Sequence, residues 1–133
     1  WDGDETFTTF APKHYHTSVP GFVYGGLLAS LVDCHATSSA AAVMYKKENR
    51  EMDTEPSYRF LTGSLFVKYL KPTPINCILQ IRGKILEISG KKVRVEVWII
   101  ANNILTVKGE VTAVQVPETY IDKIIKSAGN KIE

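Results

Sequence analysis

"VPGFVYGGLLASLVDCHATSSAAAVMYKKE", residues 19–48, is the stretch that decides the fold. From about Gly25 to Lys47 it is rich in alanine and leucine, lacks proline and ends in charged residues, which predicts one long helix. Its apolar side chains cover more than one face, so we expect the helix to be buried on most sides. A single carboxylate, Asp33, stands within it, and burying a carboxylate is unfavourable unless it is paired or functional.

Segments with β-type composition lie on both sides of this helix. Residues 92–101 alternate between apolar and charged side chains, and Asn102-Asn103 after them is suited to a tight hairpin. The expected strands are residues 5–10, 58–70, 77–88, 92–101 and 104–116, and residues 118–128 are expected to form a short terminal helix. Short turns favour antiparallel neighbours. The sequence therefore predicts an α+β fold in which one curved antiparallel sheet of about five strands wraps around one long central helix.

Composition bounds the class of protein. The 133 residues are 44% hydrophobic and 23% charged, as in an ordinary globular protein, and we expect a single domain over residues 1–133. A net charge of +2, from scattered lysines, is too small to indicate nucleic-acid binding. The apolar stretch contains Asp33 and His35 and never reaches about 18 uninterrupted apolar residues, so we expect no membrane span.

The chain contains two cysteines, Cys34 and Cys77, without the spacing of a metal site. We expect both to be buried, reduced thiols, with Cys34 filling the core, which suits the cytoplasm. Cys34 and His35 are adjacent on a helix, about 100° apart, so they are not expected to form a catalytic pair. His35 is expected to be an interior or interface histidine. The chain starts at Trp1 rather than Met, which leaves a lost targeting segment open.

Two motifs resemble those of one family. "PGFVYGGLLASLVD" is similar to the signature of hotdog-fold acyl-CoA thioesterases, in which His-Gly-Gly precedes a helix carboxylate nine positions after the histidine. Tyr24, Gly25, Gly26 and Asp33 occupy those places. "LTGSLFVKYLKPTP" is similar to the family's second-strand motif, and the order of elements matches from about residue 5 to residue 116. The resemblance implies a hotdog fold and hydrolysis of an acyl-CoA to a free acid and CoA.

The chemistry of the motif residues agrees with this activity. Gly25 and Gly26 would open a helix whose free N–H groups and dipole stabilise an oxyanion, although a glycine pair can also be a simple tight turn. Asp33 would act as general base or as nucleophile, and the residues leave those routes open. By the resemblance, Thr62 would hold the attacking water or orient Asp33. The plain alternatives are a structurally paired aspartate and a β-branched residue that fills a strand position.

The resemblance also implies a binding site for the CoA nucleotide and a role for a second copy. Candidate substrate-binding residues are Tyr24, Lys68, Leu70, Ser89, Gly90, Lys91 and Lys92, although a charged hairpin turn is often only solvated surface. No cofactor or metal is expected, because CoA is part of the substrate. Gly25 and Asp33 are eight residues apart, about 12 Å along a helix. We therefore expect a homodimer that shares its active sites, with a dimer of dimers also open.

One residue departs from the family pattern, because Tyr24 stands where the family has histidine. A phenol donates a hydrogen bond but does not reproduce the acid–base behaviour of an imidazole. The main alternative is therefore a non-catalytic acyl-CoA binding protein of the same fold. A hydroxyacyl-thioester dehydratase is less favoured, because Asp33 lies twelve residues after the Pro20-Gly21 pair, too far for that pattern.

Overall fold

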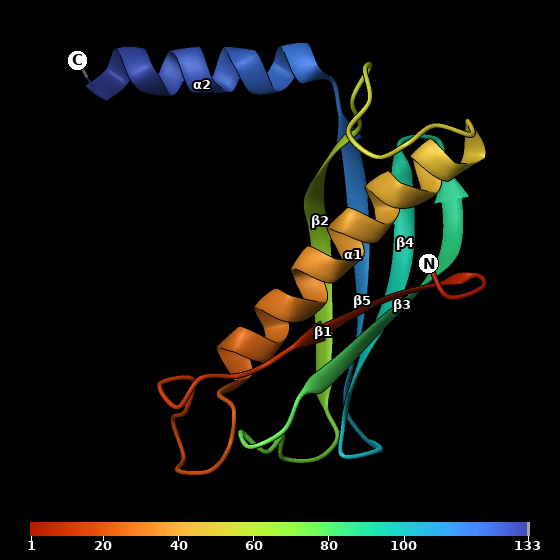
Figure 1. The fold of residues 1–133 in the computed structure, drawn as a ribbon. Helices are drawn as coiled ribbons and strands as arrows, with labels where there is room; N and C mark the ends of the chain where they lie inside the picture. Colours follow the sequence, from red (N-terminus) through yellow and green to blue (C-terminus); the bar gives the residue numbers. More distant parts are fainter. Residues whose placement is uncertain (133) are drawn as a thin grey trace.

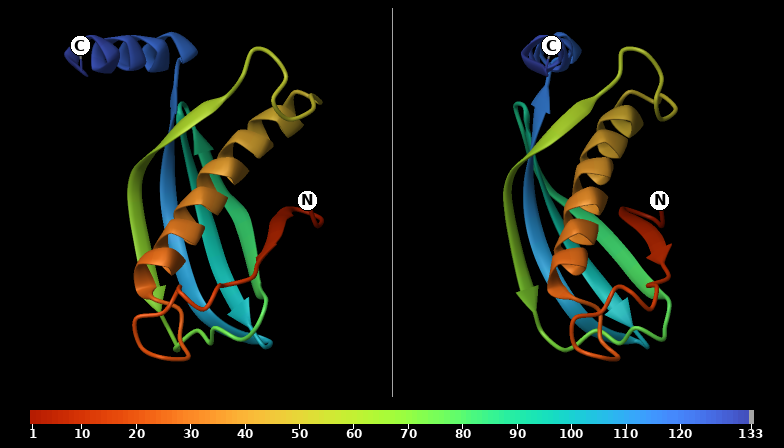
Figure 2. Two further views of the ribbon diagram at one scale, coloured as in Figure 1. Left: turned by 60° about the vertical axis from the view of Figure 1, so that its left-hand side comes forward. Right: turned by 90° about the vertical axis from the view of Figure 1, so that its left-hand side faces the viewer.

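The computed structural model describes residues 1–132, without the side chains of residues 118, 121 and 130–132; Glu133, the end of the predicted domain, lies outside the described residues. The elements are β1 (Glu5–Phe10), α1 (Gly25–Lys47), β2 (Arg59–Tyr69), β3 (Leu79–Ser89), β4 (Lys92–Ala101), β5 (Ile104–Val116) and α2 (Glu118–Ile132) (Figure 1). The strands form one five-stranded antiparallel sheet in the order β1-β3-β4-β5-β2. The sheet curves around α1 (Figure 2), which confirms the predicted α+β hotdog architecture.

The hairpin of β4 and β5 has the predicted bounds. Every second residue of β4 from Val93 to Ile99 is buried against the helix side of the sheet, as the alternating sequence requires. Asn102 and Asn103 have φ values of 51° and 63°, the left-handed conformation that closes a two-residue hairpin. Local sequence therefore accounts for the bounds and the turn of this hairpin.

Strand β2 does not pair with the strand that follows it in the chain. It pairs with β5, with Arg59 opposite Val116 and Tyr69 opposite Val107. The reason is the connection over residues 70–78, which contains Pro72 and Pro74 and is too long and irregular for a tight turn. This connection runs along the lower end of the sheet in Figure 1, from β2 to β3. Strands β1 and β2 are the two edges of the sheet.

Helix α1 packs on the sheet through one stripe of side chains. Leu28, Val32, Ala36 and Ala40 are buried against inward-facing residues of β3, β4 and β5. The expectation of burial on most sides is wrong for a single chain, because the sheet forms only one layer and covers only one stripe. By length and composition alone α1 could also span a membrane, but here one of its faces lies on the sheet of the same chain.

The cysteines and His35 also have defined places. Both thiols are free, but Cys34 is exposed and Cys77 is half-buried, so the expectation of buried thiols is wrong; Cys34 lies outside the stripe that faces the sheet. His35 points toward β1, where its Nε2 lies 2.9 Å from the Thr6 hydroxyl, and that hydroxyl lies 2.7 Å from Ser39 Oγ. Burial lowers the pKa of His35 below its usual value. It is an interior histidine, as expected.

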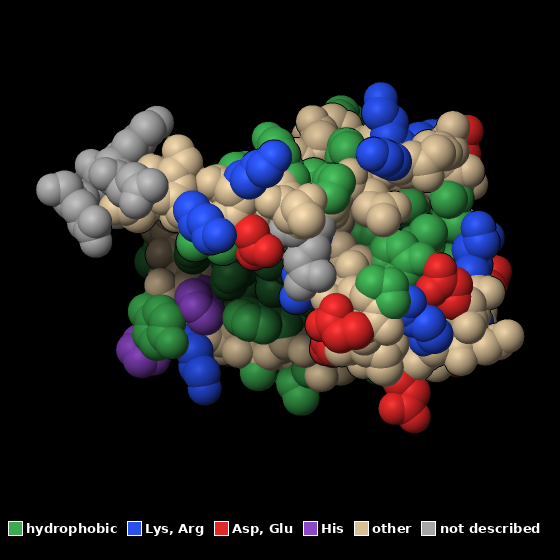
Figure 3. Space-filling model, turned by 90° about the horizontal axis from the view of Figure 1, so that it is seen from above, with side chains coloured by type: hydrophobic (Ala, Val, Ile, Leu, Met, Phe, Trp, Pro, Cys, Tyr) green, Lys and Arg blue, Asp and Glu red, His purple; other side chains and the backbone are tan. Residues whose placement is uncertain are grey.

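Strand β2 presents an apolar free edge. Within the described residues it has a strand neighbour on one side only, and most of its side chains are exposed, among them Leu61, Leu65 and Phe66, the last with 66% of its surface open. Helix α2 leaves the end of β5 and extends past this edge, roughly perpendicular to the strands (Figures 1 and 2). Seen from above, hydrophobic side chains line a recess beside α2, and most acidic side chains lie away from this recess, in the right half of the view (Figure 3).

Candidate active site

Asp33 and Thr62 meet between α1 and β2. The Thr62 hydroxyl donates a hydrogen bond of 2.6 Å to Asp33 Oδ1, although the two residues are 29 positions apart. Asp33 is half-buried on the flank of α1 that faces β2, and Thr62 is exposed at the edge of the sheet. Because one carboxylate oxygen is held in this way, the other remains available to a water or a substrate.

A β-bulge sets the direction of Thr62. The pairing of β2 with β5 shifts register between Thr62 and Ser64, so Gly63 is the extra residue. A Cβ at Gly63 would lie 2.9 Å from Val114 Cγ2, closer than real Cβ atoms approach, so no larger residue fits without a shift. Bulges bend a strand and re-aim its side chains. Gly63 is a supporting residue that the sequence analysis missed, and a glycine inside a strand was the available signal.

The N-terminus of α1 is open. Tyr24 occupies the cap position with extended backbone angles, φ −71° and ψ 148°, and its side chain makes no capping hydrogen bond. The first turn contains no acidic residue. The first backbone N–H groups of a helix have no partner inside the helix. Together with the helix dipole, they make this terminus able to stabilise a negative charge.

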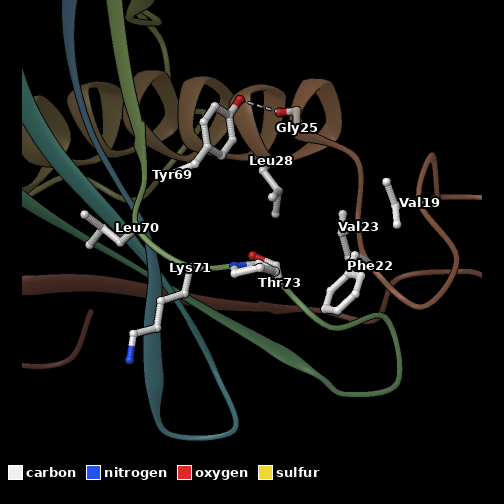
Figure 4. A pocket seen from close by; sticks show the side chains of 10 residues that line it. Val19, Phe22, Val23, Gly25, Leu28, Tyr69, Leu70, Lys71 and Thr73 are labelled. Carbon is white, nitrogen blue, oxygen red and sulfur yellow. Dashed lines mark hydrogen bonds between the residues drawn. The ribbon is translucent and has the colours of Figure 1, made fainter.

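The two glycines at this terminus each lie against a tyrosine ring. A Cβ on Gly25 would lie 3.2 Å from the ring of Tyr69, and one on Gly26 would lie 3.2 Å from the ring of Tyr24. The Tyr69 hydroxyl also donates a hydrogen bond of 2.7 Å to the carbonyl oxygen of Gly25 (Figure 4). Tyr69 thus ties the end of β2 to the first turn of α1. Tyr69 is part of the second-strand motif, but its residue type alone did not indicate this contact.

An apolar cleft of about 570 Å³ opens beside this helix end. Phe22 and Val23 line it from the loop before α1, Leu28 from the helix, and Leu70 from the segment that follows β2 (Figure 4). Lys71 is its charged neighbour. Of the predicted residues, the structure therefore brings Gly25 and Leu70 to one cleft.

Other predicted residues lie apart from this cleft. Asp33 is about 12 Å along α1 from Gly25. Lys68 is exposed on β2 opposite Lys108. The turn between β3 and β4, residues 89–92, lies at the opposite end of the sheet from the first turn of α1 (Figure 1). Among the side chains that the structure describes, no group of three or more His, Cys, Asp or Glu is arranged to hold a metal ion.

Comparison with known proteins gives three informative relatives, although no family model matches the chain. The chain is 32% identical over 84 residues to the acyl-coenzyme A thioesterase THEM4 of Xenopus laevis, covering 63% of this chain and 32% of the relative. It therefore spans about a third of that curated relative's length. A protein of Streptococcus mutans UA159, solved with acetyl-CoA bound, is 16% identical with a TM-score of 0.67, covering 86% of this chain and 82% of that one, and shares the fold.

The third relative is similar over almost its whole length. It is a thioesterase superfamily protein of Shewanella loihica PV-4, 42% identical with a TM-score of 0.71, and the match covers 88% of each chain. The TM-score over that coverage agrees with the five-stranded sheet and the long helix described above. The chain belongs to the thioesterase superfamily.

Proposed function

We propose that the chain is an acyl-CoA thioesterase in which Asp33 provides the reacting carboxylate. The observation that carries this proposal is the 2.6 Å hydrogen bond from Thr62 to Asp33, which holds the one carboxylate of α1 at the free edge of the sheet. The open helix end at Gly25 and the apolar cleft beside it supply what such a carboxylate needs for acyl transfer. The similarity to a curated acyl-CoA thioesterase over part of the chain supports the same activity.

The reaction divides between the helix end and the carboxylate. As a nucleophile attacks the thioester carbon, negative charge develops on its oxygen, and the N–H groups at Gly25 and Gly26 stabilise that charge. In one route Asp33 takes a proton from the attacking water, and the departing CoA thiolate receives it after the C–S bond breaks. In the other, Asp33 attacks directly, the C–S bond breaks, and water hydrolyses the resulting anhydride. Thr62 orients Asp33 in both routes.

One chain cannot complete this site. The carbonyl group must lie within about 3 Å of both the oxyanion donors and the attacking group, whereas Gly25 and Asp33 are about 12 Å apart. A two-fold pair with antiparallel α1 helices places Gly25 of one copy opposite Asp33 of the other and forms two equivalent sites.

The surface of the chain supports such a pair. The flank of α1 that bears Asp33 also carries Gly26, Thr37 and Met44, spaced by four and seven residues, and all are at least partly open. The neighbouring edge of β2 is apolar and lacks a second strand neighbour in the described part of the chain. An exposed apolar edge strand is a template for pairing. We therefore propose a homodimer in which the two β2 strands pair; two such dimers could form a tetramer through other surfaces.

Substrate binding divides into an apolar part and a charged part. The cleft lined by Phe22, Leu28 and Leu70 suits the apolar end of a thioester, and the ring of Tyr24 lies beside Gly26 at the helix end. The S. mutans relative was solved with acetyl-CoA. We propose a CoA nucleotide here on Lys68 of one copy and on Ser89, Gly90, Lys91 and Lys92 of the other, because antiparallel pairing of the β2 strands brings these residues to the same end of the dimer. We further propose a role in fatty-acid metabolism and a cytoplasmic location. The two free thiols favour that location, because the cytoplasm keeps thiols reduced.

The test is thiol release from a panel of short, long and aromatic acyl-CoAs, with the Asp33→Asn variant as control. We expect release from at least one acyl-CoA, and a kcat at least about 10²-fold lower for Asp33→Asn, the scale of lost acid–base assistance. Tight binding without release from any substrate would contradict the proposal and favour the non-catalytic binding protein. A variant within threefold of wild type would remove Asp33 from the chemistry.

A further inference from the structure

Helix α2 has an apolar face that no described part of the chain covers. Tyr120, Ile124 and Ile125 are 49%, 47% and 63% exposed. Residues 120, 124 and 128 are four apart and lie on one side of the helix with Ile125. Lys123 and Lys126 lie on the other side. A helix with one apolar side is stable when that side is buried. We therefore expect the apolar face of α2 to pack against another surface.

The direction of α2 indicates where that partner lies. The helix follows Val116, which pairs with Arg59, so α2 begins level with the Arg59 end of β2. It then points away from its own sheet, past the β2 edge (Figures 1 and 2). In the dimer proposed above, the two β2 strands run antiparallel, so the Arg59 end of one faces the Tyr69 end of the other.

We propose that α2 is an arm that packs on the second copy of the chain, across the Tyr69 end of that copy's sheet. This inference rests on the dimer of the proposed function and adds a second contact to it. The lengths agree. Fifteen helical residues span about 22 Å, and strands lie about 4.8 Å apart. An arm that starts at β5 therefore crosses its own β2 and then reaches β2 and β5 of the copy.

The target end of the sheet is apolar, which matches the arm. It includes the start of β5 and lies next to the cleft that the acyl group would occupy. Its exposed large hydrophobic residues outside that cleft are Ile78, Ile104 and Leu105. Packing of Tyr120, Ile124 and Ile125 on this surface buries both apolar patches, and two-fold symmetry repeats the contact.

The first experiment is disulfide trapping in a background without native thiols, with Cys34→Ser and Cys77→Ala. Chains with Ile124→Cys are mixed with chains carrying Leu105→Cys, at the target end, or Met52→Cys, at the opposite end, as the matched control. We expect a covalent dimer with Leu105→Cys and none with Met52→Cys. A disulfide within one chain, when Ile124→Cys and Met52→Cys are combined, would overturn the proposal. So would the absence of any trapped dimer from chains that sediment as dimers.

The second experiment replaces the apolar side chains of α2 by Tyr120→Ser, Ile124→Asn and Ile125→Asn. Because the dimer buries two such faces, its dissociation constant should rise at least about a hundredfold. An unchanged constant would refute the arm. Loss of binding to anionic vesicles without a change in dimerisation would also refute it and assign α2 to a membrane surface. A wild-type chain that sediments as a monomer refutes the arm as well, whereas thiol release reports hydrolysis independently.

Discussion

Co-expression of Asp33→Asn chains with Gly25→Val chains should restore about a quarter of wild-type thioesterase activity, although each variant alone is inactive. In a shared site, one copy supplies the helix end and the other supplies the carboxylate. A mixed dimer therefore contains one site with both groups intact and one site with neither. Random pairing makes about half of the dimers mixed, and half of their sites are intact, which gives the quarter.

The structure justifies both substitutions. A Cβ added at Gly25 would lie 3.2 Å from the ring of Tyr69. The larger, branched side chain of valine must therefore displace that ring and obstruct the helix end. The asparagine of Asp33→Asn keeps the volume of the aspartate and an oxygen that can accept the hydrogen bond from Thr62, but it carries no charge. Neither substitution removes a side chain of the buried core.

The assay is thiol release from the unfractionated co-expressed chains, in which two different affinity tags and mass measurement confirm the mixed dimers; mixed dimers purified by both tags should give about half of wild-type activity. The matched control combines Asp33→Asn chains with Thr62→Val chains. Asp33 and Thr62 belong to the same chain, so every site of that mixture lacks one member of the pair and activity should stay at the level of the single variants. Confirmed mixed dimers of the first kind with only single-variant activity would refute the shared site.

Three further outcomes follow from individual contacts. Tyr69→Phe removes the hydrogen bond to Gly25 but keeps the ring. The loss of about 1 kcal/mol at the helix end should lower kcat about fivefold at nearly constant KM. A loss of about 1 kcal/mol in the free energy of unfolding, with no change in kcat, would show that Tyr69 has only a structural role. Because burial lowers the pKa of His35 in the folded state, its neutral form supports stability fully above the unfolded pKa near 6.5, and that support falls as the pH drops below it. The urea midpoint of His35→Gln should therefore change less between pH 7.5 and pH 5.5 than that of wild type, and equal changes would contradict this linkage. Lys91→Ala/Lys92→Ala should raise the KM for acyl-CoA with little change in kcat, whereas a KM that is unchanged and insensitive to salt would make the turn solvated surface.

Local sequence was sufficient where neighbours along the chain determine the structure. Helix α1 and strands β1, β4 and β5 have the predicted bounds. Asn102 and Asn103 adopt the left-handed backbone that their residue type allows. In each case the deciding interactions lie within one element or one hairpin, so pattern and turn chemistry carry enough information.

The sequence was insufficient where distant segments meet. The pairing of β2 with β5 depends on the path of residues 70–78, which no periodicity describes. Cys34 looked like a core residue because α1 is apolar nearly all round, and a single sheet covers only one stripe of it. Tyr69 and Gly63 act through contacts with Gly25 and Val114, 44 and 51 residues away. The roles of Asp33 and Thr62 stay predictions, although the fold brings the two side chains together.

The late partner of β2 has a consequence for synthesis on the ribosome. Arg59 pairs with Val116, so the first residue of β2 has no strand partner until a residue 57 positions later has been synthesised. At about 5–20 residues per second, the nascent chain carries an unpaired β2 for about 3–11 s. During that interval both edges of an apolar strand are open to wrong partners. Chains that terminate before β5 should therefore aggregate rather than fold, and the yield of native protein should depend on how fast translation passes through β3 and β4.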